Sequence, residues 1–159
     1  MTRTRVVITG LGGICSLGRN ADEIWTNMKA GHDGSGPLPI EPRDLKVGIV
    51  YPLMDRMEED GIDPRRKVAM GEFSRLSVIS ARQAMAQAGL SAGDFDALRA
   101  GAVIGTGIYG ADAVDESYRD ILERGKKRTH ILTVPRAMPG APAGQVSMDL
   151  GLRGPVFGV

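Results

Sequence analysis

Three short apolar runs, each containing or ending in glycine, constrain the fold of this 159-residue chain more than any other feature. They are RVVITG at 5–10, AVIG at 102–105 and PVFGV at 155–159. Each run is too short for a buried helix and is typical of a buried strand. Because helix-forming segments separate them, the sequence predicts an α/β fold whose parallel-rich sheet is covered by helices on both faces.

Four helices are predicted, at about 20–31, 68–88, 112–123 and 142–150, from apolar residues spaced three and four apart and from end signals. The first begins with the capping-box pattern Asn20 to Glu23, and each helix ends at or just before a glycine. A short surface strand is expected at 46–51. Two inward faces are expected: Met70, Phe73, Leu76, Ile79, Ala84 and Ala88 in the second helix, and Val114, Tyr118, Ile121 and Leu122 in the third.

Composition excludes several classes of function. A net charge of +1 and an aromatic content of 4% predict neither a broad basic face nor a stacking platform for nucleic acid. The single cysteine, Cys15, excludes an internal disulfide and favours a cytoplasmic protein. No apolar stretch approaches the length that a membrane-spanning helix needs, so no membrane association is expected.

The glycine-rich turn at 10–16 does not match a nucleotide-binding motif. The G-x-G-x-x-G pattern requires glycine where Cys15 stands, and no Gly-Lys-Ser/Thr occurs for a phosphate-binding loop. A stand-alone nucleotide-binding domain is therefore a minor alternative.

No catalytic or metal-ligand pattern stands out in the chain. Cys15 is expected to be a small buried apolar side chain rather than a nucleophile. His32 and His130 lack metal-ligand spacing and are expected to be surface or hydrogen-bonded residues. The basic run 124–128 is typical of a solvated helix end, with an alternative role as a patch that meets an acidic carrier protein. No metal or organic cofactor is predicted.

Three stretches together resemble the type II β-ketoacyl-acyl-carrier-protein synthases, the condensing enzymes of fatty-acid synthesis. They are RVVITGLGGICSLG at 5–18, VIGTGIYG at 103–110 and VPRAMPGAPAGQVSMDLGLRGPVFGV at 134–159. Their order and spacing also agree, so the resemblance covers nearly the whole chain. It implies a thiolase-like fold of two similar halves, of which residues 1–159 are the N-terminal part, without the rest of the fold.

The resemblance also implies a reaction. In this family a cysteine takes an acyl group from acyl-carrier protein, and two histidines assist decarboxylation of malonyl-acyl-carrier protein and the condensation. The enzymes are usually homodimers and need no cofactor. The family's cysteine comes shortly after the stretch that matches 151–159, so it is expected beyond Val159, and the 159 residues alone are expected to be inactive. Cys15, His32 and His130 match no catalytic position.

Four residues match substrate-binding positions of the family. Ile108 corresponds to a residue that lines the acyl pocket. Thr133, Val134 and Met138 correspond to a loop that reaches toward the acyl pocket of the dimer partner. Tyr109, Thr133 and Gly140 depart from the residues common at their positions, so the preferred acyl length does not follow from the resemblance.

One alternative to an enzyme stays open. Some ketosynthase-like subunits have lost the cysteine and act as partners that shape chain length, and the position that decides this lies outside the chain. Whichever role applies, the 159 residues are expected to leave a strand edge and apolar surface uncovered. Self-association through the strand at 155–159 is the expected result.

Overall fold

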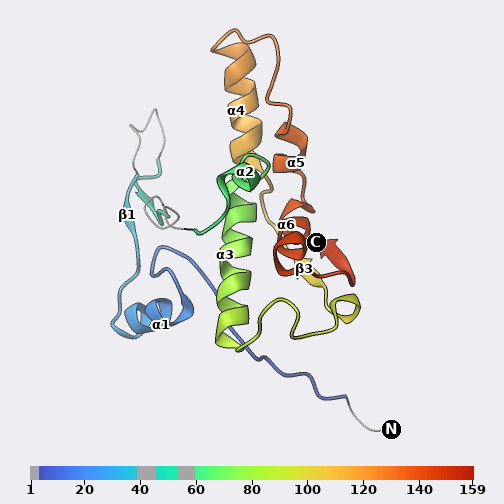
Figure 1. The fold of residues 1–159 in the computed structure, drawn as a ribbon. Helices are drawn as coiled ribbons and strands as arrows, with labels where there is room; N and C mark the ends of the chain where they lie inside the picture. Colours follow the sequence, from blue (N-terminus) through green and yellow to red (C-terminus); the bar gives the residue numbers. More distant parts are fainter. Residues whose placement is uncertain (1–3, 39–45, 54–59) are drawn as a thin grey trace.

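The computed structural model describes residues 4–38, 46–53 and 60–159, so 1–3 of the predicted domain and parts of the glycine- and proline-rich stretch 31–66 lie outside the described residues (Figure 1). The helices are α1 (Ala21–Lys29), α2 (Pro64–Lys67), α3 (Glu72–Gln87), α4 (Ala111–Leu122), α5 (Thr133–Ala137) and α6 (Ala141–Leu150), with the short 3₁₀ helix η1 (Ala97–Arg99). The strands are β1 (Gly36–Pro37), β2 (Ile49–Val50), β3 (Ala102–Ile104) and β4 (Val156–Gly158).

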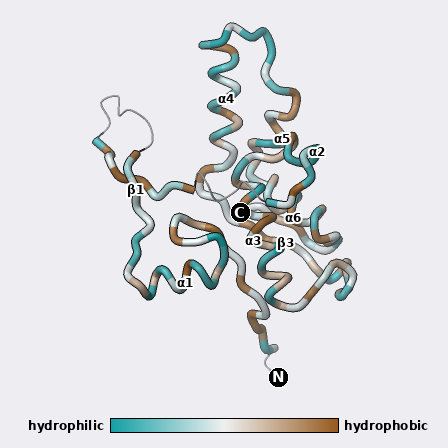
Figure 2. Tube along the Cα trace, turned by 60° about the vertical axis from the view of Figure 1, so that its left-hand side comes forward, coloured by the Kyte–Doolittle hydropathy of each residue, from teal (hydrophilic) through white to brown (hydrophobic). Residues whose placement is uncertain are grey.

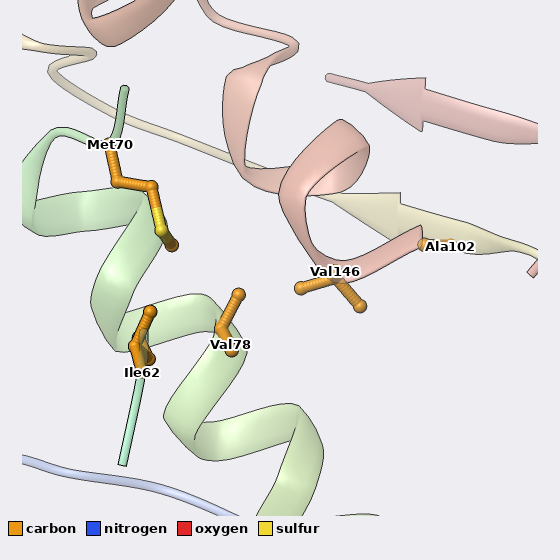
Figure 3. Close-up of a cluster of buried hydrophobic side chains, with 5 residues drawn as sticks. All are labelled: Ile62, Met70, Val78, Ala102 and Val146. Carbon is orange, nitrogen blue, oxygen red and sulfur yellow. The ribbon is translucent and has the colours of Figure 1, made fainter. Parts of the chain in front are cut away.

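Helix α3 is the centre of the structure, and α6 packs along it (Figure 1). The apolar core lies between these helices and β3, and it consists of Ile62, Met70, Val78, Ala102 and Val146 (Figure 3). The predicted inward face of this helix was partly wrong. Ser74 and Val78 are fully buried, whereas Phe73, Leu76 and Ile79 are only half-buried, because α6 approaches α3 on the side of Val78.

Most predicted helix ends are confirmed. The Oδ1 of Asn20 accepts a hydrogen bond from the N–H of Glu23 at 2.9 Å and so caps α1. Gly89 and Gly151 adopt positive φ angles just after α3 and α6, and proline stands in the first turn of α6. The exception is the start of α3, which begins at Glu72 instead of 68, after the separate short helix α2 and an extended Gly71.

Strands β3 and β4 form the predicted parallel pair, with Ala102 opposite Val156 and Ile104 opposite Gly158. Helix α6 contacts both strands. Val103 and Phe157 are opposite one another in the register and are 68% and 57% exposed. Within the described ranges, therefore, this pair has helical cover on one face, and the predicted cover on the second face is not seen. β1 and β2 form a separate antiparallel pair, which confirms the short strand expected within 46–51.

The predicted buried strand at 5–10 is wrong. Val6 and Ile8 are 91% and 82% exposed, and this segment pairs with no strand in the described part of the chain. Without a neighbouring strand an apolar run has no ladder to join. In Figure 1 the segment instead passes the end of α3 and extends away from the helices.

The glycine turn after this segment lies directly on α3. A Cβ on Gly12 would overlap the carbonyl oxygen of Ser80, so only glycine allows this approach. Two glutamines of α3 take the place of a neighbouring strand. The Oε1 of Gln87 accepts from the N–H of Leu11 at 2.6 Å, and the Oε1 of Gln83 accepts from the N–H of Gly13 at 2.9 Å.

Two buried aspartates tie α2 and α3 to their surroundings. Asp149 on α6 accepts two hydrogen bonds from Arg82 on α3, at 2.7 and 2.8 Å, and pairs with Arg66 on α2. Asp60 pairs in the same way with Lys67 and Arg75. Burial by itself would raise the pKa of both carboxyl groups. Hydrogen bonds from their cationic partners outweigh burial, so each pKa lies below its ordinary value. Both aspartates are therefore charged in the folded protein and hold α2 and α3 in place through ion pairs.

None of the helices in the described ranges is both long and apolar enough to cross a lipid bilayer.

Candidate functional site

Helices α4 and α5 form a hairpin that projects beyond the α3–α6 core, and all four residues of the predicted substrate site lie on it or at its base (Figure 1). The predicted inward face of α4 was wrong. Tyr118 and Leu122 are 64% and 76% exposed, whereas Ala113 and Asp120 are buried. Figure 2 shows apolar positions interspersed with polar ones along this helix. The reason is that α4 packs mainly on the short α5, which covers only part of its surface.

Helix α5 presents two of the predicted residues on one face. Val134 and Met138 are one turn apart, and the N–H of Met138 donates to the carbonyl of Val134 at 3.0 Å. Both side chains are exposed. Thr133 faces α4 instead, since its Oγ1 lies 3.1 Å from the Oγ of Ser117 and donates to the carbonyl of His130 at 2.7 Å. Val134 and Met138 therefore form one apolar surface, whereas the hydroxyl of Thr133 makes hydrogen bonds within the hairpin.

Ile108 lies in the turn between β3 and α4 and is 82% exposed. Two residues later, Gly110 has a φ of 41° and lies so close to α5 that an added Cβ would overlap the backbone of Ala137. This contact places the turn of Ile108 beside the end of α5 that carries Met138. The structure thus groups three of the four predicted residues around the base of the hairpin.

One side-chain contact anchors the hairpin to the core and another joins its two helices. The N–H of Glu72, in the first turn of α3, donates to the Oδ2 of Asp112 on α4 at 3.1 Å. The Nη1 of Arg136 on α5 pairs with the Oε2 of Glu116 on α4 at 2.9 Å. Sequence patterns did not reveal these partners, because neither pair has helical or strand spacing.

The basic run 124–128 is partly used within the fold. Arg124 and Lys126 pair with Asp120 at 2.7 and 2.9 Å and close the end of α4. The hydrogen bond from Lys126 and, to a smaller extent, the one from Arg124 hold the pKa of Asp120 below its ordinary value. Lys127 and Arg128 are exposed at the tip of the hairpin. All five residues of the run are exposed, so the expectation of a solvated helix end is confirmed.

Within the described residues, no hydrogen bond joins Cys15, His32 or His130 to one another. Cys15 is half-buried in a tight turn, where its backbone exchanges two hydrogen bonds with Gly18. His32 lies 3.3 Å from the Oδ1 of Asn27, and the Nδ1 of His130 accepts from the N–H of Leu132 at 3.1 Å. Both histidines are exposed and hydrogen-bonded, as predicted. Cys15 is more open than the buried position predicted for it.

Across the described ranges, no group of three His, Cys, Asp or Glu side chains is arranged to hold a metal ion. A depression near α1 is lined by Leu11, Asn20, Asp22, Gln83 and Gln87, among others. It lies at the C-terminal end of α3, whereas α5 contacts the opposite end at Gly71. The depression is therefore separate from the residues around Ile108.

Comparisons with known proteins identify the family of the chain. A family profile described as "Beta-ketoacyl synthase, N-terminal domain" matches residues 3–159, and the chain belongs to this family. It is 47% identical over 155 residues to Nodulation protein E of Rhizobium sp. (strain N33), a match that covers 98% of this chain and 39% of that protein. It is 32% identical over 152 residues to 3-oxoacyl-[acyl-carrier-protein] synthase 2 of Staphylococcus aureus (strain N315), with coverage of 95% and 37%.

Solved structures give the same fold. A β-ketoacyl synthase from Burkholderia phymatum STM815 superposes with a TM-score of 0.77 and 27% identity, over 96% of this chain and 38% of that one. The ishigamide ketosynthase/chain length factor superposes with a TM-score of 0.78 over 98% of this chain and 40% of that one, and at 22% identity it shows the fold alone. The chain has the N-terminal part of the ketosynthase, thiolase-like fold, and it spans about two fifths of the length of the curated relatives it matches.

Proposed function

We propose that the whole protein is a 3-oxoacyl-[acyl-carrier-protein] synthase that elongates acyl chains in fatty-acid synthesis. A cysteine thiolate displaces the carrier thiol of acyl-carrier protein and holds the acyl group as a thioester. Loss of CO₂ from malonyl-acyl-carrier protein then leaves a carbanion that attacks this thioester, which forms the ketoacyl product and frees the cysteine. The family and the relative named as a synthase of this kind support the proposal.

The observation that carries the proposal is the register of β3 and β4. The strands are parallel, and the N–H of Thr106 donates to the carbonyl of Val159 at 3.0 Å, so their carboxyl ends lie side by side. Ligands of such sheets bind at the carboxyl ends of strands. A cysteine shortly after Val159 would stand at the same edge as the turn of Ile108. The side chain of Ile108 would then lie close to the acyl group bound to that cysteine.

The proposed partners follow from the same surfaces. Lys127 and Arg128, exposed at the tip of the hairpin, suit an acidic acyl-carrier protein. The exposed face of Val134 and Met138 suits contact with a second subunit's acyl pocket, so the protein is proposed to be a homodimer. A chain with a single cysteine suits the cytoplasm. Sedimentation of the whole protein should give the mass of a dimer.

The test compares the 159-residue chain with the longest protein that its gene encodes. Each is given acyl- and malonyl-acyl-carrier protein, and ketoacyl product is measured by mass spectrometry. The long protein should form product and lose it when the nucleophilic cysteine is replaced by alanine. The 159-residue chain should form none, and turnover by this chain alone would contradict the proposed role of a later cysteine.

A second candidate is a partner subunit without the cysteine that shapes chain length. The position that decides this role lies outside the 159 residues, as it does for the enzyme. The residue that the gene encodes at the nucleophile position decides between the two. A residue other than cysteine there would overturn the enzyme proposal in favour of the partner subunit.

A further inference from the structure

Arg136 divides α5 into two faces. It comes two residues after Val134 and two before Met138, so at 100° per residue it points away from both. Its side chain is only 19% exposed, whereas Val134 is 72% exposed. The guanidinium reaches back to α4, where its Nη1 pairs with the Oε2 of Glu116 at 2.9 Å. The ion pair on one face of α5 thus holds the helix so that the opposite, apolar face is exposed.

The backbone at Arg136 also contacts the core. Its carbonyl oxygen lies 2.7 Å from the position that a Cβ on Gly71 would occupy, so α5 lies directly on the residue that begins α3. The Nε of Arg136 is buried without a hydrogen-bond partner in the part of the chain that the structure describes. The position of the guanidinium therefore depends on the carboxylate of Glu116.

We propose that Arg136, held by Glu116, is a positioning residue that sets where Val134 and Met138 stand and thereby which acyl-chain lengths the synthase accepts. The inference rests on the proposed function. If the ion pair is lost, α5 keeps its backbone contact with Gly71 and can turn slightly about that contact, and both apolar side chains move together. A change of one methylene in an apolar pocket alters the specificity of an enzyme by about tenfold or more, so a small rotation is sufficient.

The kinetic test uses the longest protein that the gene encodes, with acyl-carrier protein loaded with saturated primers of increasing length. Arg136→Met and Glu116→Gln should each change the ratio of kcat/KM for the longest and shortest accepted primers by about tenfold, with KM for malonyl-acyl-carrier protein unchanged. Arg136→Lys keeps the positive charge and should restore most of the ratio. Asp115→Asn is the matched control, because it breaks an exposed ion pair to Arg119 on the same helix α4. An unchanged ratio in both Arg136→Met and Glu116→Gln would overturn the proposal.

A second measurement does not need activity. Hydrogen exchange at the amide of Met138, which bonds to Val134, should speed up about tenfold in Arg136→Met and Glu116→Gln but not in Asp115→Asn, with α3 amides unchanged. Unchanged exchange at Met138 would overturn the positioning role. Faster exchange throughout α3 in both variants would overturn it too, because the pair would then support the whole fold. A wild-type protein that forms no ketoacyl product contradicts the proposed function alone, since the exchange result still decides the role of Arg136.

Discussion

Asp149 and Asp115 both pair with arginine, but they represent two differently built regions. The side chain of Asp149 is 5% exposed and joins three helices of the core through Arg66 and Arg82. The side chain of Asp115 is 61% exposed and pairs with Arg119 on the next turn of α4. An exposed pair is screened by water, whereas removing one member of a buried pair leaves an uncompensated charge. The core is therefore held by a buried carboxylate that joins three helices, whereas the buried aspartate of the hairpin, Asp120, pairs with Arg124 and Lys126 just after its own helix.

The largest effect is expected in the core. Asp149→Ala leaves two partly exposed arginines beside the vacated site and should lower the free energy of unfolding of the 159-residue chain by about 3 kcal/mol. Urea denaturation followed by circular dichroism measures the change. Asp115→Ala is the control in the hairpin. Equal losses of unfolding free energy in the two variants would show that the core and the hairpin do not differ in how strongly they depend on their ion pairs.

Acid should act on the same core contacts. The folded-state pKa values of Asp60 and Asp149 lie below those in the unfolded chain, so their stabilisation is complete above about pH 4 and is lost as pH falls through the folded values. The loss should be smaller than in Asp149→Ala, because a protonated carboxyl group still accepts hydrogen bonds. Urea midpoints between pH 7 and pH 3 measure it. Asp149→Asn should flatten this dependence, and an unaltered acid slope would show that other groups control it.

The base of the hairpin should be the next most sensitive position. Gly110→Ala places a Cβ against the backbone of Ala137 at a positive φ and should cost about 2 kcal/mol. Limited proteolysis should then cut 123–132 faster while α3 stays intact. Gly125→Ala is the matched control, with a positive φ and open space, and it should cost about 1 kcal/mol. Equal cleavage of both variants would remove the special role of the contact at Gly110.

The smallest effect is expected for the exposed pair itself. Asp115→Asn removes an i,i+4 ion pair on α4 with little change in helix propensity and should lower the free energy of unfolding by about 0.3 kcal/mol at low salt. In 1 M salt the difference from wild type should disappear. Paired urea titrations at the two salt concentrations measure it. A loss above 1 kcal/mol would mean that the hairpin depends on charge as strongly as the core does.

The predictions that held were those with a local cause. Asn20, Gly89 and Gly151 were recognised as helix ends because a side-chain cap or a positive φ is decided within a few residues. The family resemblance then supplied the overall fold. Whether the four substrate residues bind acyl chains stays a prediction.

The predictions that failed depended on tertiary partners. The run at 5–10 has the composition of a buried strand, yet burial requires a neighbouring strand that the described residues do not supply. The inward face of α4 was misjudged because apolar spacing does not say how much of a helix its neighbour covers. Asp149 could have been suspected, since it follows the buried Val146 by three residues on α6. The pair of Arg136 and Glu116 had no signal of this kind.

The two glutamines of α3 that bind the glycine turn differ in the hydrogen bonds that they make. The side-chain oxygen of Gln87 accepts a hydrogen bond from the N–H of Leu11 in the turn. Gln83 accepts from Gly13 and also donates from its Nε2 to the carbonyl of Arg19 at 2.6 Å. Glutamate can reproduce the first role but cannot donate in the second. The contacts of Gln87 thus tolerate an exchange of amide for acid, and those of Gln83 do not, although the residues are identical and one helical turn apart.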